Sequence, residues 1–428
     1  MSARLNPARS AHREAAPLFR SFWMAGFEGA DHINQNEEAL DLVCASGHLR
    51  SVDEDFANLA RLGLRTVRES VGWRLSELPG QRGRFDFSRA LRFTELANGH
   101  GLQVLWSLMH YGTPPDVSLL SDDFCERFAD FAAAAARALR PLMPDAPIYT
   151  PINEIGFLAW AASETALFHP YGAQRSGASG TTLHSGFDIK CRLVRASLLA
   201  MDAIREEDPR ARFLQIEPLV HVVAPRESPE LAELANEVRG YQWQVWDLLE
   251  GRLLPELGGR PDQLDLIGVN HYHSGQWEVG TEDRLLWHTR DPRRMPFSAL
   301  LREAWTRYHR PLVVAETSHI GVGRAQWLDD IATQVQIARD TGVPVDGLCL
   351  YPIVDRPDWG DASHWHNSGL WDLDRTRCEG SVHRARHLLS ADVAAPMVPR
   401  RLQLNYAKAL RRWMDRLPGP TTNQEQQP

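Results

Sequence analysis

Short apolar runs recur along the chain, separated by segments long enough to form a helix. Eight runs are rich in apolar or β-branched residues, and several are nearly continuous in apolar character, as in strands covered on both faces. The predicted strands are Phe22–Gly26, Thr66–Ser70, Gln103–Leu108, Ile148–Asn153, Phe213–Glu217, Leu266–Asn270, Leu312–Glu316 and Gly347–Pro352.

The segments between these runs carry apolar residues at helical spacing and end at glycine or Asp-Pro signals. The predicted helices are Asp53–Leu62, Ser88–His100, Ser121–Leu139, Leu183–Glu207, Pro229–Leu254 and Arg324–Asp340. Eight strands alternating with helices predict an α/β fold, a (β/α)8 TIM barrel. A doubly wound sheet is the alternative, but no Gly-x-Gly-x-x-Gly follows the first run to favour it.

No linker interrupts the pattern, so one barrel domain is expected over residues 21–416. An extended arm is expected over residues 1–20, and the polar composition of residues 417–428 predicts a disordered tail. In a barrel, the connections that follow strands shape the catalytic mouth. The long ones are 27–52, 154–182, 271–297 and 353–380.

Composition narrows the functional classes. The net charge of -8 comes without a basic cluster, which argues against a nucleic-acid partner. No run of eighteen apolar residues predicts a membrane span, and the first residues lack a signal-peptide pattern, so a cytoplasmic location is expected. Five scattered cysteines without Cys-x-x-Cys predict neither a disulfide framework nor a cysteine zinc site. The 14 tryptophans include candidates for flat platforms against sugar rings.

Two glutamates stand at the ends of predicted strands: Glu154 follows the fourth run and Glu316 ends the seventh. Carboxylates at the carboxyl ends of barrel strands point into a shared mouth. A retaining glycosidase uses two such carboxylates, about 5–5.5 Å apart. Arg68, near the end of the second strand, is the expected cation for Glu316. Taken singly, either glutamate could instead be structural, paired with an arginine at a strand end.

Other carboxylates compete for these roles. Glu217 ends the fifth run and is the main rival, and Glu28, Asp31 and Glu69 lie near the first two strands. Because side chains alternate along a strand, Glu69 is expected to point away from the side of Arg68 and to form an ion pair outside the barrel.

Histidines offer two further types of site. His110, at the end of the third strand, could donate a hydrogen bond to a sugar hydroxyl. His271 and His273, and likewise His364 and His366, have a spacing that could hold a metal. Zinc sites need three or four protein ligands, and no third ligand is evident near either pair. No metal and no cofactor is therefore expected.

Seven segments, in order over most of residues 22–375, resemble the motifs of glycoside hydrolase family 1. This family belongs to the clan of retaining (β/α)8 glycosidases. Thr150-Pro151-Ile152-Asn153-Glu154, for example, resembles its Thr-x-Asn-Glu-Pro motif, with one more residue before the Asn. The segments are Arg68–Trp73, Leu108–Pro114, Thr150–Ile155, Ile267–Tyr272, Val314–Ser318, Asp355–Trp359 and Ser368–Leu370.

The resemblance implies a role for each matching residue. Glu154 would be the acid/base and Glu316 the nucleophile. Asn153 would bond the sugar 2-hydroxyl, and Arg68 and Tyr272 would contact Glu316. His110 and Trp359 would lie in the first sugar subsite. Asn270 matches the asparagine of its motif, and Asp358 stands at the position of a family glutamate.

The sequence also departs from the family pattern around the sugar. No glutamine follows the first strand until Gln35, Asp358 is one methylene shorter than the family's glutamate, and Thr317-Ser318 replace Asn-Gly. These changes predict retained chemistry with an altered sugar preference.

The resulting prediction is a retaining β-glycosidase that acts on a small glycoside or oligosaccharide. A transglycosylase using the same site and a non-catalytic carbohydrate-binding barrel are the alternatives. The sugar, the aglycone and the oligomeric state are left open.

Overall fold

Eight parallel strands close into a barrel in the order β1-β10-β9-β7-β5-β4-β3-β2. The computed structural model describes residues 17–172, 186–373 and 399–418. The barrel strands are β1 (Trp23–Gly26), β2 (Thr66–Ser70), β3 (Gln103–Met109), β4 (Ile148–Ile152), β5 (Arg212–Pro218), β7 (Leu266–Asn270), β9 (Leu312–Thr317) and β10 (Val345–Leu350). The predicted (β/α)8 barrel is confirmed, with each predicted strand shifted by at most two residues at an end.

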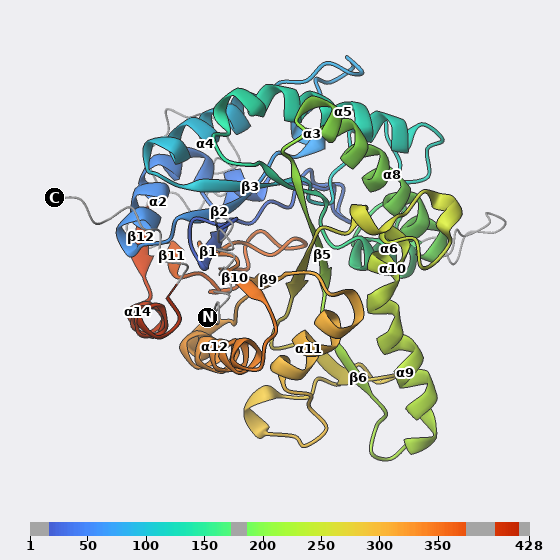
Figure 1. Cartoon of the computed structure of the whole chain (residues 1–428), viewed down its shortest axis with the longest axis vertical. Helices are drawn as coiled ribbons and strands as arrows, with labels where there is room; N and C mark the ends of the chain where they lie inside the picture. The colour runs from blue at the N-terminus through green and yellow to red at the C-terminus, as the bar shows by residue number, and fades with distance from the viewer. Residues whose placement is uncertain (1–16, 173–185, 374–398, 419–428) are drawn as a thin grey trace, which may run out of the picture.

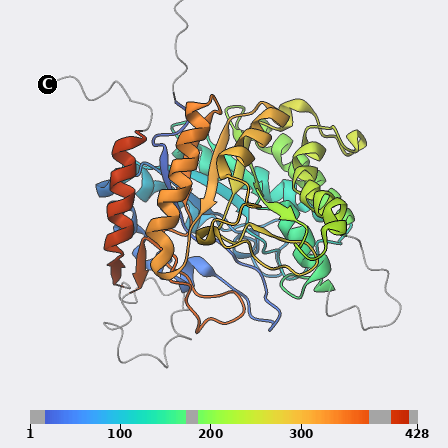
Figure 2. The same ribbon diagram turned by 90° about the horizontal axis from the view of Figure 1, so that it is seen from below.

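Helices surround the barrel, as Figure 1 shows. They are α1 (Leu42–Ala45), α2 (His48–Leu62), α3 (Trp73–Ser76), α4 (Ser88–Gly99), α5 (Phe124–Leu139), α6 (Ile155–Glu164), α8 (Gly186–Glu207), α9 (Ala232–Gly240), α10 (Gln244–Leu249), α11 (Phe297–Tyr308), α12 (Arg324–Asp340) and α14 (Leu404–Arg416). Helix α14 lies beside α12, which Figure 2 shows clearly. Within the described residues, no helix combines the length and apolar character needed to span a bilayer.

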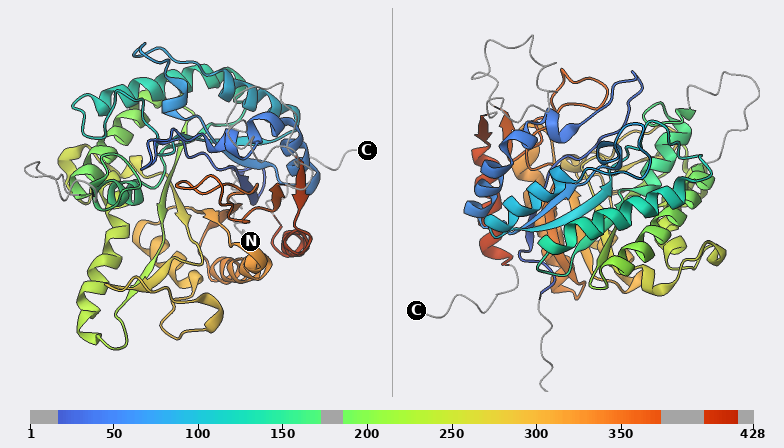
Figure 3. Two further views of the ribbon diagram at one scale, coloured as in Figure 1. Left: turned by 180° about the vertical axis from the view of Figure 1, so that it is seen from behind. Right: turned by 90° about the horizontal axis from the view of Figure 1, so that it is seen from above.

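Two small sheets accompany the barrel. Strand β6 (His221–Val223) pairs in parallel with β8 (Gln276–Glu278), and β11 (Trp371–Leu373) pairs antiparallel with β12 (Arg400–Leu402). Helix α9 and the β6 region extend away from the ring of helices, as the left view of Figure 3 shows. The second sheet joins the last part of the chain to the connection after β10.

Several helix predictions need correction. The single helix expected over Pro229–Leu254 is wrong, because α9 ends at Gly240 and a 3₁₀ turn over Tyr241–Trp243 separates it from α10. Glycine is a weak helix former, and the break lets Trp243 and Trp246 pack around the ring of Tyr308.

Helix α2 begins five residues before the predicted Asp53, directly after the left-handed Gly47. The early start was hidden because the polar His48 is buried there in place of an apolar residue. Helices α6, α11 and α14 were not predicted, nor were the four-residue helices α1 and α3. Residues 1–16 of the expected arm, 419–428 of the expected tail and parts of two long connections lie outside the described residues.

The strands are buried on both faces, in two layers of side chains. An inner cluster fills the barrel and includes Met24, Leu105, Ile216 and Val313. A larger outer cluster joins the opposite strand faces to the helices. The inner cluster is apolar, while polar side chains gather at the carboxyl ends of the strands. The polar site therefore packs directly against the apolar interior of the barrel.

Strand β9 contains a bulge that decides the orientation of one glutamate. Val313 and Ala315 belong to the inner cluster and Val314 to the outer one, so strict alternation would turn Glu316 outward. In the pairing with β7, however, Val314 and Glu316 oppose consecutive residues, so β9 holds one extra residue there. The pairing with β10 also contains one extra residue on β9. A bulge re-aims the next side chain, and here Glu316 returns to the barrel interior.

Candidate active site

Glu154 lies two residues beyond β4, at the start of α6. Its backbone N–H donates to the carbonyl of Ile216 at 3.1 Å, and that of Asn153 donates to Met109 at 3.0 Å, so neighbouring strands hold the segment in place. Glu154 has a φ of 46°, in the left-handed region. Such a conformation costs a non-glycine residue about 1–3 kcal/mol and is found mostly at functional sites.

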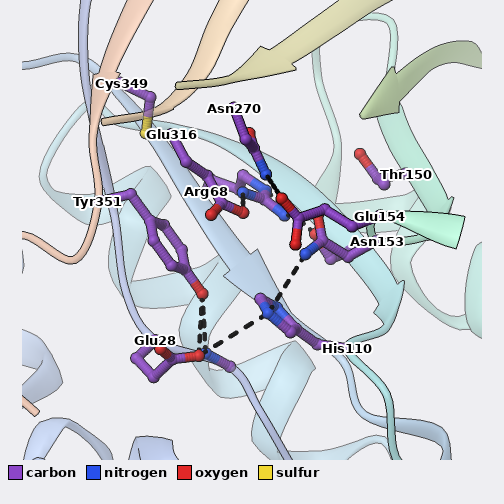
Figure 4. A network of polar contacts seen from close by, with 12 residues as sticks. Glu28, Arg68, His110, Thr150, Asn153, Glu154, Asn270, Glu316, Cys349 and Tyr351 are labelled. Carbon is purple, nitrogen blue, oxygen red and sulfur yellow. Dashed lines mark hydrogen bonds and ion pairs between the residues drawn. The ribbon is translucent and has the colours of Figure 1, made fainter. Parts of the chain in front are cut away.

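Glu316 is buried and held by two donors on separate oxygens. Arg68 Nη1 donates to Oε1 at 2.5 Å, and the Tyr272 hydroxyl donates to Oε2 at 2.6 Å. The guanidinium of Arg68 also balances the carboxylate charge inside the barrel. Figure 4 shows Arg68 and Glu316 facing one another near Glu154. The two contacts fix the orientation of the Glu316 carboxylate and give it a charged partner.

Glu154 has a different environment, since both of its oxygens meet neutral groups. Asn270 Nδ2 donates to Oε1 at 2.7 Å and the Tyr111 hydroxyl to Oε2 at 2.8 Å. Burial and, to a smaller extent, the charge of Glu316 raise the pKa of Glu154 to about 7, against the opposing effects of these hydrogen bonds and of Arg68. Near neutral pH, Glu154 can therefore both hold and release a proton.

Asn153 joins the two carboxylates through their partners. Its Oδ1 accepts from Arg68 Nη2 at 2.6 Å, and its Nδ2 donates to the Tyr111 hydroxyl at 3.1 Å. The same Nδ2 lies 3.3 Å from His110 Nε2 (Figure 4). The structure thus brings the predicted Arg68, His110, Asn153, Glu154, Asn270, Tyr272 and Glu316 into one network.

His110 is buried and neutral. Burial and the nearby charge of Arg68 place its pKa well below the usual range. Its Nε2 lies 3.8 Å from Glu28, and its ring is stacked at 6.0 Å on that of Tyr351. A neutral imidazole between two polar groups suits hydrogen bonding to a hydroxyl.

Four residues of the site were not predicted: Glu28 stood only among the rival carboxylates, and Tyr111, Tyr351 and Arg356 had no predicted role. The Tyr351 hydroxyl donates to Glu28 at 3.2 Å, and Arg356 Nε contacts the other Glu28 oxygen at 2.8 Å. A side chain at Gly26 would collide with the Tyr351 ring, so this tyrosine fills the space beside the end of β1. Tyr351 directly follows β10, and the strand-end argument used for Glu154 could have selected it.

Asp358 and Trp359 lie on the loop after β10. The carboxylate of Asp358 accepts from the backbone N–H of Gly360 at 2.8 Å and contacts His366 at 3.1 Å. No contact found among the described residues joins it to the two glutamates. Trp359 packs at 5.6 Å on the Tyr111 ring, and its indole Nε1 has no partner within the described part of the chain. Trp359 adjoins the site, whereas Asp358 is occupied by its own loop.

Two of the rival carboxylates, Glu217 and Glu69, face away from the barrel interior. Leu214 and Ile216 belong to the inner cluster, so Glu217 points outward, where it accepts from the Gly156 N–H at 2.9 Å. Burial raises the pKa of Glu217 to about 8. Glu69 also points outward and contacts His48 at 2.9 Å, as alternation predicts. Both side chains therefore lie outside the barrel interior.

The histidine pairs do not form clusters with other ligands. The ring centres of His271 and Phe297 are 4.5 Å apart in a stacked arrangement, and those of His273 and His319 are 4.2 Å apart. Burial lowers the pKa of His271 and of His273 to about 4. Over the ranges that the structure describes, no three His, Cys, Asp or Glu side chains are grouped as metal ligands would be.

Comparison with known proteins gives a structural match without a sequence match. No family model matches the sequence, and a search of curated proteins finds no match either. The chain is similar in structure to the AHE enzyme from Alicyclobacillus herbarius, with 16% identity, a TM-score of 0.65 and coverage of 92% of this chain and 98% of that one.

Two β-glucosidase structures give the same result. A hyperthermophilic β-glucosidase mutant has a TM-score of 0.66 at 16% identity over 92% of this chain and 99% of that one. The β-glucosidase from Thermotoga maritima in complex with glucoimidazole has a TM-score of 0.65 at 14% identity over 92% and 97%. The resemblance inferred from the motifs is confirmed at the level of the fold: the chain has the barrel of the β-glucosidases, in a divergent sequence.

Proposed function

We propose that the protein is a retaining β-glycosidase in which Glu316 is the nucleophile and Glu154 the acid/base. The observation that carries this proposal is that two buried carboxylates of one hydrogen-bond network have different donors. Glu316 has a cation and a phenol as donors, while Glu154 has two neutral donors and a pKa of about 7. Two carboxylates in different protonation states are what double displacement requires.

In the first step, a Glu316 oxygen attacks the anomeric carbon. The bond between that carbon and the leaving oxygen breaks, and Glu154 gives its proton to the leaving oxygen. In the second step, Glu154 takes a proton from water as the water oxygen attacks the same carbon. The ester bond to Glu316 then breaks and both carboxylates return to their first states. The reaction uses no cofactor.

A mechanism-based label tests the proposal. Intact-protein mass is measured after incubation with 2-deoxy-2-fluoro β-glycosides of several sugars, each with a good leaving group, followed by peptide mapping. An adduct on Glu316 supports the nucleophile and identifies an accepted sugar. An adduct on Glu217 would overturn the assignment, and binding of the panel without any adduct or turnover would favour a non-catalytic carbohydrate-binding barrel.

The remaining features of the proposal concern the substrate and the setting. We propose a small glycoside or oligosaccharide as substrate and a cytoplasmic location. The Tyr351–Glu28–Arg356 contacts lie next to His110, and we assign them to recognition of the sugar in place of the missing glutamine. Transfer to an added alcohol instead of water, seen by product analysis, would identify a transglycosylase.

A further inference from the structure

Tyr111 connects the two carboxylates, and its hydroxyl contacts Glu154 directly. The hydroxyl donates to Glu154 Oε2 at 2.8 Å and accepts from Asn153 Nδ2 at 3.1 Å. Asn153 Oδ1 accepts from Arg68 at 2.6 Å, and Arg68 donates to Glu316 at 2.5 Å. A continuous chain of hydrogen bonds therefore runs from Glu154 to Glu316 through Tyr111.

The backbone at Tyr111 is held in an uncommon conformation. Its φ is 80°, in the left-handed region that costs a non-glycine residue about 1–3 kcal/mol. The next residue, Gly112, donates its N–H to the buried Asp31 at 3.0 Å, and a side chain at Gly112 would collide with Asp31. The ring packs at 4.8 Å on Phe168 and at 5.6 Å on Trp359. The strained turn is thus fixed on several sides.

The bonds around Tyr111 determine which oxygen of Glu154 can carry the proton. The hydrogen bond from Arg68 to Asn153 Oδ1 fixes the orientation of the Asn153 side-chain amide, so its nitrogen faces the Tyr111 hydroxyl and donates to it. Oε1 of Glu154 faces the Asn270 nitrogen, which can only donate. The proton therefore belongs on Oε2, where a hydroxyl can either donate or accept.

We propose that Tyr111 is the positioning residue of the acid/base. It directs the proton to Oε2 of Glu154. Its hydroxyl donates when Glu154 is ionised and accepts when Glu154 is protonated, and in the latter state its own hydrogen turns to water or to a substrate hydroxyl. The inference rests on the proposed function and gives a role to a residue that the motif comparison left without one.

Charged and titratable groups face Glu154 from several elements, so the test must separate Tyr111 from them. They are Arg68 of β2, Glu217 of β5, Tyr272 after β7 and Glu316 of β9. Tyr272 provides the matched control, because its hydroxyl donates to Glu316 in the way that Tyr111 donates to Glu154. Tyr111→Phe and Tyr272→Phe each remove one hydroxyl and keep the ring.

The first measurement is a direct titration of Glu154 by carboxyl ¹³C NMR, with the resonance assigned by its loss in Glu154→Gln. Donation by Tyr111 favours the ionised carboxylate, so Tyr111→Phe should move the midpoint upward by on the order of one pH unit. Tyr272→Phe should move it by less than half as much. An unmoved midpoint in Tyr111→Phe, or equal shifts in both variants, would overturn the proposal.

The second measurement is the pH profile of kcat/KM on a glycoside with a poor leaving group, for which Glu154 must supply the proton. Its alkaline limb follows the pKa of the acid in the free enzyme, so the limb should shift to higher pH in Tyr111→Phe and by less than half as much in Tyr272→Phe. A uniform loss of rate with an unmoved limb would show a merely structural role. Normal turnover by Glu154→Gln would instead refute the proposed function, while the titration would still report on the contact between Tyr111 and Glu154.

Discussion

Two buried ionic networks lie on opposite sides of strand β2, starting from consecutive residues. Arg68 points into the barrel and joins Glu316, Asn153 and, through them, Glu154. Glu69 points outward to His48, which also contacts Asp55 at 2.8 Å. Both networks are almost completely buried, so burial and ion pairing alone do not distinguish a catalytic site from a structural one.

The balance of charge distinguishes them. The outer network matches the carboxylates of Glu69 and Asp55 with two cations, because His48 has an acidic partner on each ring nitrogen and Arg400 forms a double contact with Asp55. The inner network offers one cation, Arg68, to two carboxylates. One inner carboxylate must therefore hold a proton easily, and Glu154, with neutral donors, is that group.

The architecture also differs. The outer network joins α2 and β2, which are neighbours in sequence, to the distant strand β12, and so it stabilises the fold. The inner network gathers residues from the carboxyl ends of β2, β3, β4, β7 and β9, where a barrel places its chemistry. The comparison predicts that substitutions in the inner network alter turnover and that substitutions in the outer network alter stability.

The largest expected effect is on turnover, from Glu316→Ala. Loss of the nucleophile should reduce kcat on any accepted glycoside by roughly 10⁴-fold or more, as for other covalent catalysts. The control is Glu217→Gln, which changes a buried carboxylate on the outer side of β5 and should retain activity within roughly tenfold. Steady-state kinetics measure both, and normal turnover in Glu316→Ala would exclude the assignment.

The next effect depends on the leaving group. Glu154→Gln removes the proton donor and should slow poor leaving groups by roughly 10²–10⁴-fold, because proton transfer contributes about that much. Activated aryl glycosides need little protonation and should lose far less in the bond-breaking step. Rates for a series of leaving groups measure the difference, and equal losses across the series would contradict the acid role.

A substitution in the outer network should alter the stability of the protein instead of its turnover. Asp55→Ala leaves the charges of His48 and Arg400 buried without their partner, which should lower the free energy of unfolding by roughly 3–5 kcal/mol. Glu54→Ala, at an exposed neighbouring position on α2, is the control and should change little. Denaturant unfolding measures both, and equal stabilities would show that the network contributes nothing net.

The smallest effect is a pH dependence of stability. Burial disfavours a charged His48, but its two carboxylate partners outweigh burial and raise its pKa above the usual 6.5. A raised pKa contributes stability that is present below pH 6.5 and is lost as pH rises through the folded-state value. The stability difference between the wild type and His48→Gln should therefore shrink toward alkaline pH. A difference that grew with pH would show that His48 is neutral in the folded protein.

The sequence indicated much of this site because strand ends are local features. Glu154, Glu316 and Arg68 were selected by their positions at the ends of apolar runs, and the outward direction of Glu69 followed from alternation. The same reasoning gave no direction for Glu217. Both faces of a parallel strand are apolar, so the pattern does not show which face lines the barrel until neighbouring strands are in register.

The sequence by itself determined the eight strands, several of the long helices between them and the carboxylates at the strand ends, because these depend on short-range periodicity. Only the tertiary structure decided that Glu316 points inward, since a bulge forms through pairing with β7 and β10. It also decided that Tyr111 reaches Glu154 and that Asp358 turns to its own loop. Loop backbones take their conformation from long-range contacts, such as that of Asp31 with Gly112, which no local pattern encodes.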